Sequence, residues 1–238
     1  PEAWKPITLR QLLSHTAGIL REGPAFEFLR TKPDIEVIRS AYARPLEFAP
    51  GEKWQYCNVC YFALAEVITR VSGTAWPAFL EERIFRPLGM TATRATSTFD
   101  IVSHRVRGYD WREGVYRNSD LQVAVRPSGA LLSNVLDLAK WDGALYTERP
   151  LAGAIKEQMW SPIRLNSGGT HNYGFGWETG VFQGRRYVGH GGSLAGFRSH
   201  YMRFPDSKLS VIVLTNLDGA RPNVITQRVA GQYLEEAG

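Results

Sequence analysis

Apolar residues recur every three or four positions in several stretches of the chain, which is the spacing of an amphipathic helix. The clearest case spans residues 58–71, and Gly73 follows it where a left-handed C-cap residue is expected. The apolar face of this predicted helix is made of Phe62, Ala65, Ile68 and Val71.

Shorter segments repeat the helical spacing. Residues 7–13 predict a short helix with Thr8 as its N-cap, and its apolar positions are Leu9, Leu12 and Leu13. Residues 34–43 place Ile35, Ile38 and Ala41 on one side. Further helices are expected over residues 76–85, 134–146 and 223–235. The helix over 134–146 is expected to bury Leu138, Trp141 and Leu145. The helix over 223–235 places Ile225, Val229 and Tyr233 on one face, which is expected to cover the sheet.

After about residue 172 the pattern changes to the aromatic and β-branched residues that are typical of strands. Strands are expected over residues 173–179, 185–189, 197–204 and 209–215, and the turn at 205–208 pairs the last two as a hairpin. Helices first, an antiparallel sheet later and a closing helix over that sheet predict an α+β fold. We expect one domain, with a helical region over about residues 1–165 and the sheet with its C-terminal helix over about 170–238.

Composition narrows the class of protein without naming a function. The 238 residues are 44% hydrophobic and 21% charged, which is ordinary for a soluble globular protein. No stretch approaches the roughly 18 apolar residues of a membrane span. The formal net charge is +5, but the basic residues are scattered, and the densest places are the pairs Arg105/Arg107 and Arg185/Arg186. We therefore expect a solvated basic surface and no nucleic-acid partner.

Cys57 and Cys60, the only two cysteines, form a C-x-x-C, a pattern found in redox dithiols and in half of a zinc site. No second ligand pair accompanies them, none of the five histidines lies at a companion spacing, and the predicted helix begins between them. We therefore expect no metal and no cofactor. The cysteines leave the cellular compartment open.

Two local sequences carry the residue types of acyl-transfer chemistry. Residues 50–58, Pro-Gly-Glu-Lys-Trp-Gln-Tyr-Cys-Asn, resemble the P-G-x-x-x-x-Y-S-N segment of class C β-lactamases, D-alanyl-D-alanine peptidases and related esterases. Residues 189–197, Gly-His-Gly-Gly-Ser-Leu-Ala-Gly-Phe, resemble the strand that bears K-T-G in penicillin-binding proteins, in the H-x-G form common among the esterase-like members.

Supporting segments extend this resemblance across nearly the whole chain. Residues 8–18 resemble the family's helix and L-L-x-H-T-[AS]-G turn, and residues 85–90 resemble its F-x-P-L-G-M segment. Residues 127–138 and 203–216 resemble its P-x-G-G-L-x-S-T-x-x-D-L segment and its closing hairpin. The resemblance implies a β-lactamase/transpeptidase-like α+β fold.

The nucleophile of this family is the Ser of an S-x-x-K motif at a helix N-terminus. No serine here, from Ser14 to Ser210, has Lys three positions later, and the family places that motif before the segment that resembles residues 1–18. Residues 1–6 show neither an initiator methionine nor a signal-peptide pattern. We therefore expect a C-terminal portion that is inactive alone, with its Ser and Lys upstream. The resemblance implies a periplasmic or secreted protein, with the cytoplasm also open.

Tyr56 and Asn58 are the candidate catalytic residues of the first motif. A serine hydroxyl needs a neighbouring base, and the resemblance implies that Tyr56 is this base, with its phenol pKa depressed by adjacent cations. The resemblance also implies that Asn58 points its amide towards the substrate carbonyl and the Lys. The alternatives are that Tyr56 is a core aromatic and that Asn58 is only the N-cap of the following helix.

The second motif supplies His190, Gly191, Gly192 and Ser193. By the resemblance, His190 replaces the Lys of K-T-G beside Tyr56 and donates to a substrate carboxylate or carbonyl. The two glycines leave room for substrate along the strand edge, and the backbone N–H of Ser193 supplies one of two oxyanion-hole donors. The alternatives for this stretch are a plain turn and a phosphate loop, although it lacks the Lys-Ser/Thr ending of a P-loop.

The remaining histidines are interpreted without a catalytic role. His15 is expected to be structural in the turn at residues 14–18, and His104, His171 and His200 are expected to be surface or strand residues.

These observations favour a serine hydrolase that acts by acyl-enzyme transfer on a small-molecule ester, a lactam, an amide or a D-Ala-type peptide. His in place of Lys favours an esterase or a peptidase over a true β-lactamase, because neutral imidazole holds a carboxylate less firmly than ammonium. The alternative is a non-catalytic module that binds peptidoglycan-like or acyl ligands in the same pocket. An unrelated hydrolase using Ser128 or Ser193 is disfavoured because no G-x-S-x-G elbow is present.

Overall fold

A computed structural model of the chain describes residues 1–26, 32–97, 99–119, 126–129 and 131–235. Its α-helices are α1 (Leu9–Leu13), α2 (Asp34–Ala41), α3 (Asn58–Ser72), α4 (Trp76–Leu80), α5 (Val135–Ala144), α6 (Gly153–Met159) and α7 (Pro222–Glu235). A 3-10 turn at Glu2–Trp4 precedes α1, and a π-helical turn at Glu81–Phe85 continues α4.

The main sheet is antiparallel and has the strand order β10-β9-β8-β7. Its strands are β7 (Glu178–Phe182), β8 (Arg185–Leu194), β9 (Phe197–Phe204) and β10 (Leu209–Thr215). The short strands pair in twos, as β1 (Arg94–Ala95) with β4 (Leu131–Leu132), β2 (Tyr109–Arg112) with β3 (Val115–Asn118), and β5 (Ile163–Arg164) with β6 (Thr170–His171). The predicted α+β fold is confirmed.

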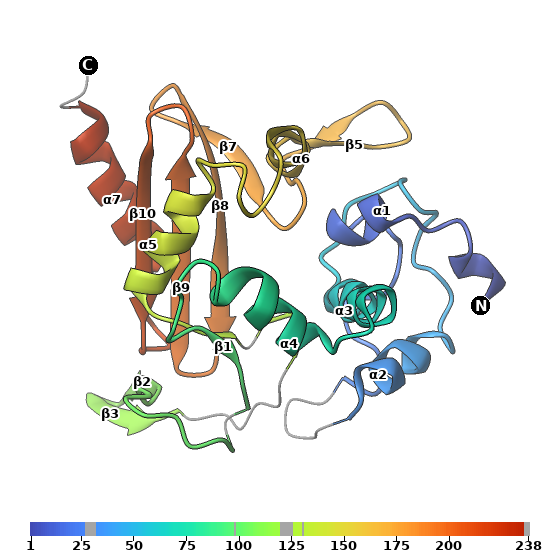
Figure 1. The fold of residues 1–238 in the computed structure, drawn as a ribbon, viewed down its shortest axis with the longest axis horizontal. Coiled ribbons are helices and arrows are strands. Elements are labelled where there is room, and N and C mark those ends of the chain that lie inside the picture. The colour runs from blue at the N-terminus through green and yellow to red at the C-terminus, as the bar shows by residue number, and fades with distance from the viewer. Residues whose placement is uncertain (27–31, 98, 120–125, 130, 236–238) are drawn as a thin grey trace.

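Helices and sheet occupy different parts of the molecule. In Figure 1, α1, α2 and α3 gather on one side, and the main sheet lies on the other with α5 and α7. Successive side chains of a strand point to opposite faces of a sheet. Met202 and Phe204 of β9 accordingly pack on Ala230 and Leu234 of α7, and the intervening Arg203 bonds to Asp142 of α5. The helices α5 and α7 therefore cover opposite faces of the sheet.

The helical region has a core of its own between α1, α3 and the turn that joins α1 to the next segment. Its buried members are Leu12, Ala17, Ile19, Ala41, Cys57, Val59 and Cys60. Thr8 caps α1 as predicted, since its hydroxyl accepts the amide N–H of Gln11 while the Gln11 side chain accepts the amide N–H of Thr8. This core fixes the segments on which the first motif lies.

The prediction for the buried face of the closing helix was wrong by one position. Ile225 and Tyr233 are exposed and Val229 packs only partly against the sheet, whereas Thr226, Ala230 and Leu234 are buried there. The buried face is small and partly polar, so the apolar pattern did not reveal it. The hydroxyl of Thr226 is satisfied by the carbonyl of Asn223 and by Nδ1 of His200.

Two strand boundaries also differ from the prediction. No strand begins at Tyr173, because the amide of Gly174 turns back to the carbonyl of Trp177, and Tyr173 forms only an isolated bridge with Glu178. By contrast, β8 runs past the predicted end at Gly189 to Leu194, because β9 pairs with each of these positions.

The ends of two predicted apolar faces are exposed. Leu9 of α1 and Val71 of α3 lie at the surface, since each stands where its helix leaves the core. Gly73 adopts the predicted left-handed C-cap conformation, with φ of 70°. Among the described residues, no helix is long and apolar enough to cross a membrane.

Candidate active site

The Tyr-Cys-Asn segment is held against the turn that follows α1. The amide of Gln55 donates to the carbonyl of His15 at 2.9 Å, and the amide of Cys57 donates to Nδ1 of the same histidine at 3.1 Å. The amide of Asn58 then donates to the carbonyl of Arg21 at 2.9 Å. These three bonds fix the backbone on both sides of Tyr56 before α3 begins.

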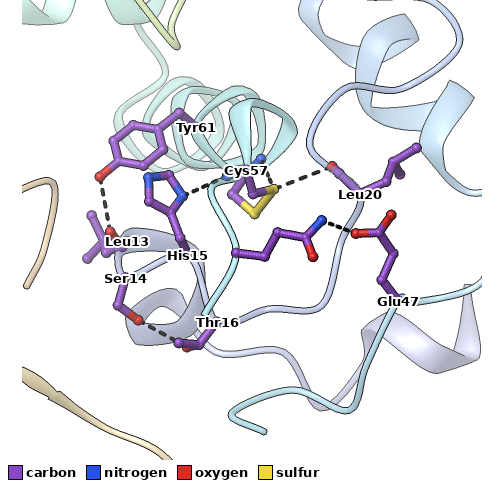
Figure 2. The surroundings of a disulfide bond; sticks show 10 residues. Leu13, Ser14, His15, Thr16, Leu20, Glu47, Cys57 and Tyr61 are labelled. Atoms are coloured by element: carbon purple, nitrogen blue, oxygen red, sulfur yellow. Dashed lines mark hydrogen bonds between the residues drawn. A yellow bond between two sulfur atoms is a disulfide. The ribbon is translucent and has the colours of Figure 1, made fainter. Parts of the chain in front are cut away.

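Cys57, rather than Asn58, is the N-cap of α3. Its Sγ accepts the amide N–H of Cys60 at 3.0 Å, and Asn58 is the first helical residue, so the interpretation of Asn58 as the N-cap is corrected. The two cysteines are also joined as a disulfide, shown in Figure 2, and both are almost fully buried. The Cys57–Cys60 disulfide thus spans the first turn of α3, directly after Tyr56.

Asn58 directs its side chain to the loop that follows the turn. Its Nδ2 donates to Oε1 of Glu22 at 3.0 Å. An amide nitrogen carries two protons and the amide oxygen accepts two bonds, so this contact leaves the Asn58 side chain further capacity to donate and accept.

The structure brings Tyr56 and His190 together from distant parts of the chain. Their ring centroids lie 6.2 Å apart, although Tyr56 precedes α3 and His190 lies on β8. The resemblance had implied that His190 stands beside Tyr56, and the two rings do lie close together.

His190 is held by two partners within the chain. Its Nδ1 lies 2.7 Å from the carbonyl oxygen of Gly191, and its Nε2 lies 3.0 Å from the hydroxyl of Tyr173. A carbonyl oxygen only accepts, so in the neutral ring the proton is on Nδ1 and the Tyr173 hydroxyl donates to Nε2. A bond from His190 to substrate, as the sequence predicts, therefore requires exchange of one of these partners.

Sequence reasoning missed Tyr173. It is buried, and burial raises its phenol pKa, which keeps the hydroxyl a proton donor at neutral pH. In the sequence it is one aromatic among several near the start of the sheet, and no local pattern distinguishes it. Only its position against His190 identifies it as part of the site.

The phenol of Tyr56 is not made acidic by the described residues. Burial raises its pKa, Arg21 lowers it, and Glu178 raises it again, with a net upward shift. The guanidinium carbon of Arg21 lies 5.2 Å from the ring centroid of Tyr56. The described residues alone therefore do not depress this pKa, because one partly solvated cation does not outweigh the loss of hydration, and the depressed pKa in the complete site stays a prediction.

Gly191, Gly192 and Ser193 form an exposed stretch of β8. The pairing of β7 with β8 ends at Gly189, so the later residues of β8 pair only with β9 and their other edge lacks β7. A side chain at Gly192 would approach the hydroxyl of Ser199 to 2.2 Å, so the glycine leaves room for the Ser199 side chain in its present position. Because this stretch is a strand, the alternatives of a plain turn and a phosphate loop are excluded.

The other histidines lie at the surface, in strands or in the turn after α1. His104 is exposed, His171 lies in β6 and stacks on Trp54 with ring centroids 4.3 Å apart, and His200 lies in β9, as expected of surface and strand residues. His15 does lie in the predicted turn, but its ring is also buried against Tyr56, with a centroid distance of 4.3 Å. Its place in the site was not predicted.

A protein-family model described as Beta-lactamase matches residues 1–234. The chain belongs to the beta-lactamase family. Over 236 residues it is 30% identical to penicillin-binding protein 4* of Bacillus subtilis (strain 168), covering 90% of this chain and 52% of that protein.

A D-aminopeptidase of Cereibacter sphaeroides (strain ATCC 17029 / ATH 2.4.9) is 27% identical to this beta-lactamase-family chain over 238 residues, which is 97% of this chain and 46% of that enzyme. The octameric penicillin-binding protein homologue from Pyrococcus abyssi matches in structure with a TM-score of 0.82 at 27% identity. That match covers 98% of this chain and 59% of the other, and it confirms the β-lactamase/transpeptidase-like fold. The chain spans about half the length of the curated relatives it matches.

Proposed function

We propose that the protein is a serine hydrolase that forms an acyl-enzyme with an ester, an amide or a peptide that carries a D-amino acid. The nucleophilic Ser and its Lys are placed outside these 238 residues, because no serine within them is followed by Lys at the third position. The observation that supports this proposal most is the proximity of Tyr56 and His190, whose ring centroids lie 6.2 Å apart.

In the acylation step, Tyr56 transfers a proton from the serine to the leaving group. The serine oxygen attacks the carbonyl carbon of the substrate while the Tyr56 oxygen takes the serine proton and passes it to the leaving alcohol or amine. The bond to the leaving group breaks and the acyl group stays on the serine. Water then attacks the acyl-enzyme, and the same proton transfer in reverse restores the serine.

The raised pKa of Tyr56 indicates what the proposed segment with the Ser and Lys would supply. Arg21 only partly offsets the effect of burial on this phenol. A Lys ammonium beside the Tyr56 oxygen would favour the phenolate further, since a nearby opposite charge lowers the pKa of an acid. Asn58 has one N–H and its amide oxygen left over from its contact with Glu22, and the oxygen is suited to accept from that Lys.

The exposed end of β8 is proposed to hold the substrate. Its edge beyond Gly189 has no β7 partner, so substrate can lie along it. The amide N–H of Ser193 would then stabilise the negative oxygen of the tetrahedral intermediate, together with the amide of the nucleophilic serine. His190 lines the same stretch as the residue that orients a substrate carbonyl or carboxylate.

The choice of first substrate follows from the relatives. One of them is a D-aminopeptidase, so D-alanine p-nitroanilide is the first compound to assay, with its L-enantiomer as the matched control. We also propose p-nitrophenyl acetate for esterase activity and nitrocefin for β-lactamase activity. Because His190 replaces an ammonium, we expect the lactam to be the poorest of these substrates.

The deciding experiment compares the complete protein with the 238-residue chain. The complete protein should hydrolyse at least one of these substrates and gain the mass of one acyl group when quenched early, and the chain alone should do neither. Equal turnover by both would contradict the proposal that the nucleophile lies outside these residues. Tight binding of a D-amino acid by the complete protein, with no turnover of any substrate, would favour the non-catalytic binding module instead.

A further inference from the structure

His15 forms hydrogen bonds with the candidate catalytic segment on both sides of Tyr56. Its backbone carbonyl accepts the amide of Gln55 at 2.9 Å, and its ring Nδ1 accepts the amide of Cys57 at 3.1 Å. One residue of the turn thus bonds to the residues immediately before and after Tyr56. A shift of His15 would therefore move the backbone from which the Tyr56 side chain projects.

The ring of His15 also contacts the ring of Tyr56 directly, with centroids 4.3 Å apart and planes inclined by 42°. The ring centroids of Tyr61 and Tyr173 each lie 5.1 Å from the ring centroid of His15. Figure 2 shows the His15 ring between Tyr61 and Cys57. His15 is 1% exposed, so this packing leaves it a single orientation.

The backbone of His15 adopts an uncommon conformation to reach this position. Its φ is 59°, in the left-handed region that residues other than glycine rarely enter. Such conformations persist only where the surrounding structure determines them, and they concentrate at functional sites. Here the conformation turns the ring Nδ1 towards the amide of Cys57.

The protonation state of His15 is fixed by its partner. An amide N–H only donates, so Nδ1 carries a lone pair and the ring proton is on Nε2. Burial, then His190 and Arg21, lower the ring pKa to about 3, which keeps His15 neutral under ordinary conditions. Its Nε2 is buried and has no hydrogen-bond partner among the described residues. His15 is therefore a constant acceptor for Cys57.

We propose that His15 is a positioning residue for Tyr56, which sets the place and tilt of the phenol through the Cys57 hydrogen bond and through ring contact. This inference rests on the proposed function, because it takes Tyr56 to be the base. His15 itself is not proposed to touch the substrate. The competing interpretation is a histidine that only fills the core between α1 and α3.

The test uses two substitutions that both tolerate the left-handed backbone. In His15→Asn the side-chain oxygen can replace Nδ1 as acceptor, whereas His15→Gly removes the acceptor and the ring. In the complete protein, His15→Gly should lower kcat by on the order of 100-fold with little change in KM, because a misplacement of about 1 Å can cost that much. His15→Asn should recover at least tenfold of this loss.

The same two changes are then made in a Tyr56→Phe background. If His15 acts through Tyr56, His15→Gly should lower kcat less than about twofold once the phenol oxygen is gone, since coupled residues are not additive. An undiminished loss in this background would overturn the inference, and so would equal kcat values for His15→Asn and His15→Gly in otherwise normally folded proteins.

A measurement without substrate separates this inference from the proposed function. The ¹⁵N shifts of His15 should show an unprotonated Nδ1 and a protonated Nε2 throughout pH 5 to 8, and the Cys57 amide should exchange slowly. A proton on Nδ1 overturns the inference whatever the activity. If Tyr56→Phe remains fully active, the assignment of the base fails and the role of His15 fails with it. If Tyr56→Phe is impaired and His15→Gly is not, only the role of His15 fails.

Discussion

The hydroxyl of Tyr173 donates a hydrogen bond to Nε2 of His190, with 3.0 Å between the two heavy atoms. The other ring nitrogen of His190 lies 2.7 Å from the carbonyl of Gly191, so both nitrogens are occupied and the ring is fixed in one plane. This arrangement couples the loop before β7 to the strand that carries the second motif. It also sets the tautomer of the only histidine that the second motif contains.

Replacement of Tyr173 with Phe should leave this tautomer unchanged, because the carbonyl of Gly191 can only accept and therefore keeps the proton on Nδ1. The aromatic ring keeps its buried packing, and the lost hydrogen bond should lower the free energy of unfolding by about 1 kcal/mol. The ¹⁵N shifts of the neutral His190 ring should still show a protonated Nδ1 and an unprotonated Nε2. A proton on Nε2 in Tyr173→Phe would contradict this expectation and show that the Tyr173 hydroxyl is needed to hold the tautomer.

Replacement of Tyr56 with Phe tests the proposed base. The substitution removes the phenol oxygen and keeps the ring that contacts His15, so the fold should survive. General-base assistance is typically worth about 10²- to 10⁴-fold, and kcat/KM on the best substrate of the complete protein should fall within that range. A fall of less than about threefold in a normally folded variant contradicts the assignment and favours Tyr56 as a core aromatic.

The parts of the fold that could be predicted are those that local pattern determines. The helix α3 follows from its apolar spacing and Gly73, and the hairpin of β9 and β10 follows from its turn residues and β-branched strands. The buried face of α7 could not be predicted, because Thr226 and Ala230 pack there by fitting closely against the sheet rather than by being strongly apolar.

The candidate site was predictable only where a motif carries it. Tyr56 and His190 were named from two motifs, and the structure brings their rings together. Tyr173 belongs to none of these motifs, and His15 lies in a turn motif whose contact with Tyr56 was not foreseen. Both residues join the site through tertiary contacts between segments that are distant in the chain, and such contacts leave no local periodicity. The pKa of Tyr56 also depends on burial, which is a property of the folded protein.

The disulfide between Cys57 and Cys60 gives a prediction about accessible thiols. The native and the denatured, unreduced forms of the 238-residue chain should both fail to react with a thiol reagent, and two thiols should appear after reduction in denaturant. Thiols that titrate without reductant would contradict the disulfide.

A Cys57→Ser/Cys60→Ala double variant tests what this disulfide contributes. Ser is a favoured N-cap, so α3 should still begin at Asn58. Closing so short a loop constrains the unfolded chain by only about 2 kcal/mol, which bounds the expected loss in the free energy of unfolding. The measurement is urea unfolding at pH 7, with the oxidised parent protein as the control.

The buried His15 should make the protein less stable as the pH falls. Burial, then His190 and Arg21, lower its pKa from 6.5 to about 3 in the folded protein. Between these two pH values the unfolded chain binds a proton that the folded protein does not, so acid favours unfolding. Because each unit of difference is about 1.4 kcal/mol, His15 should account for a loss on the order of 3 kcal/mol by pH 4.

His15→Asn is the matched control for this loss, because asparagine does not titrate and keeps an acceptor for the Cys57 amide. Carboxylates elsewhere titrate in both proteins, so the difference between their free energies of unfolding isolates His15. The parent protein should be the more stable of the two at pH 7, and its advantage should shrink as the pH falls from about 6.5 towards 4. Urea unfolding across this range measures the difference at each pH. An advantage that stays constant would mean that His15 takes up its proton equally well in the folded and unfolded states, which a ring enclosed by Tyr56, Tyr61 and Tyr173 should prevent.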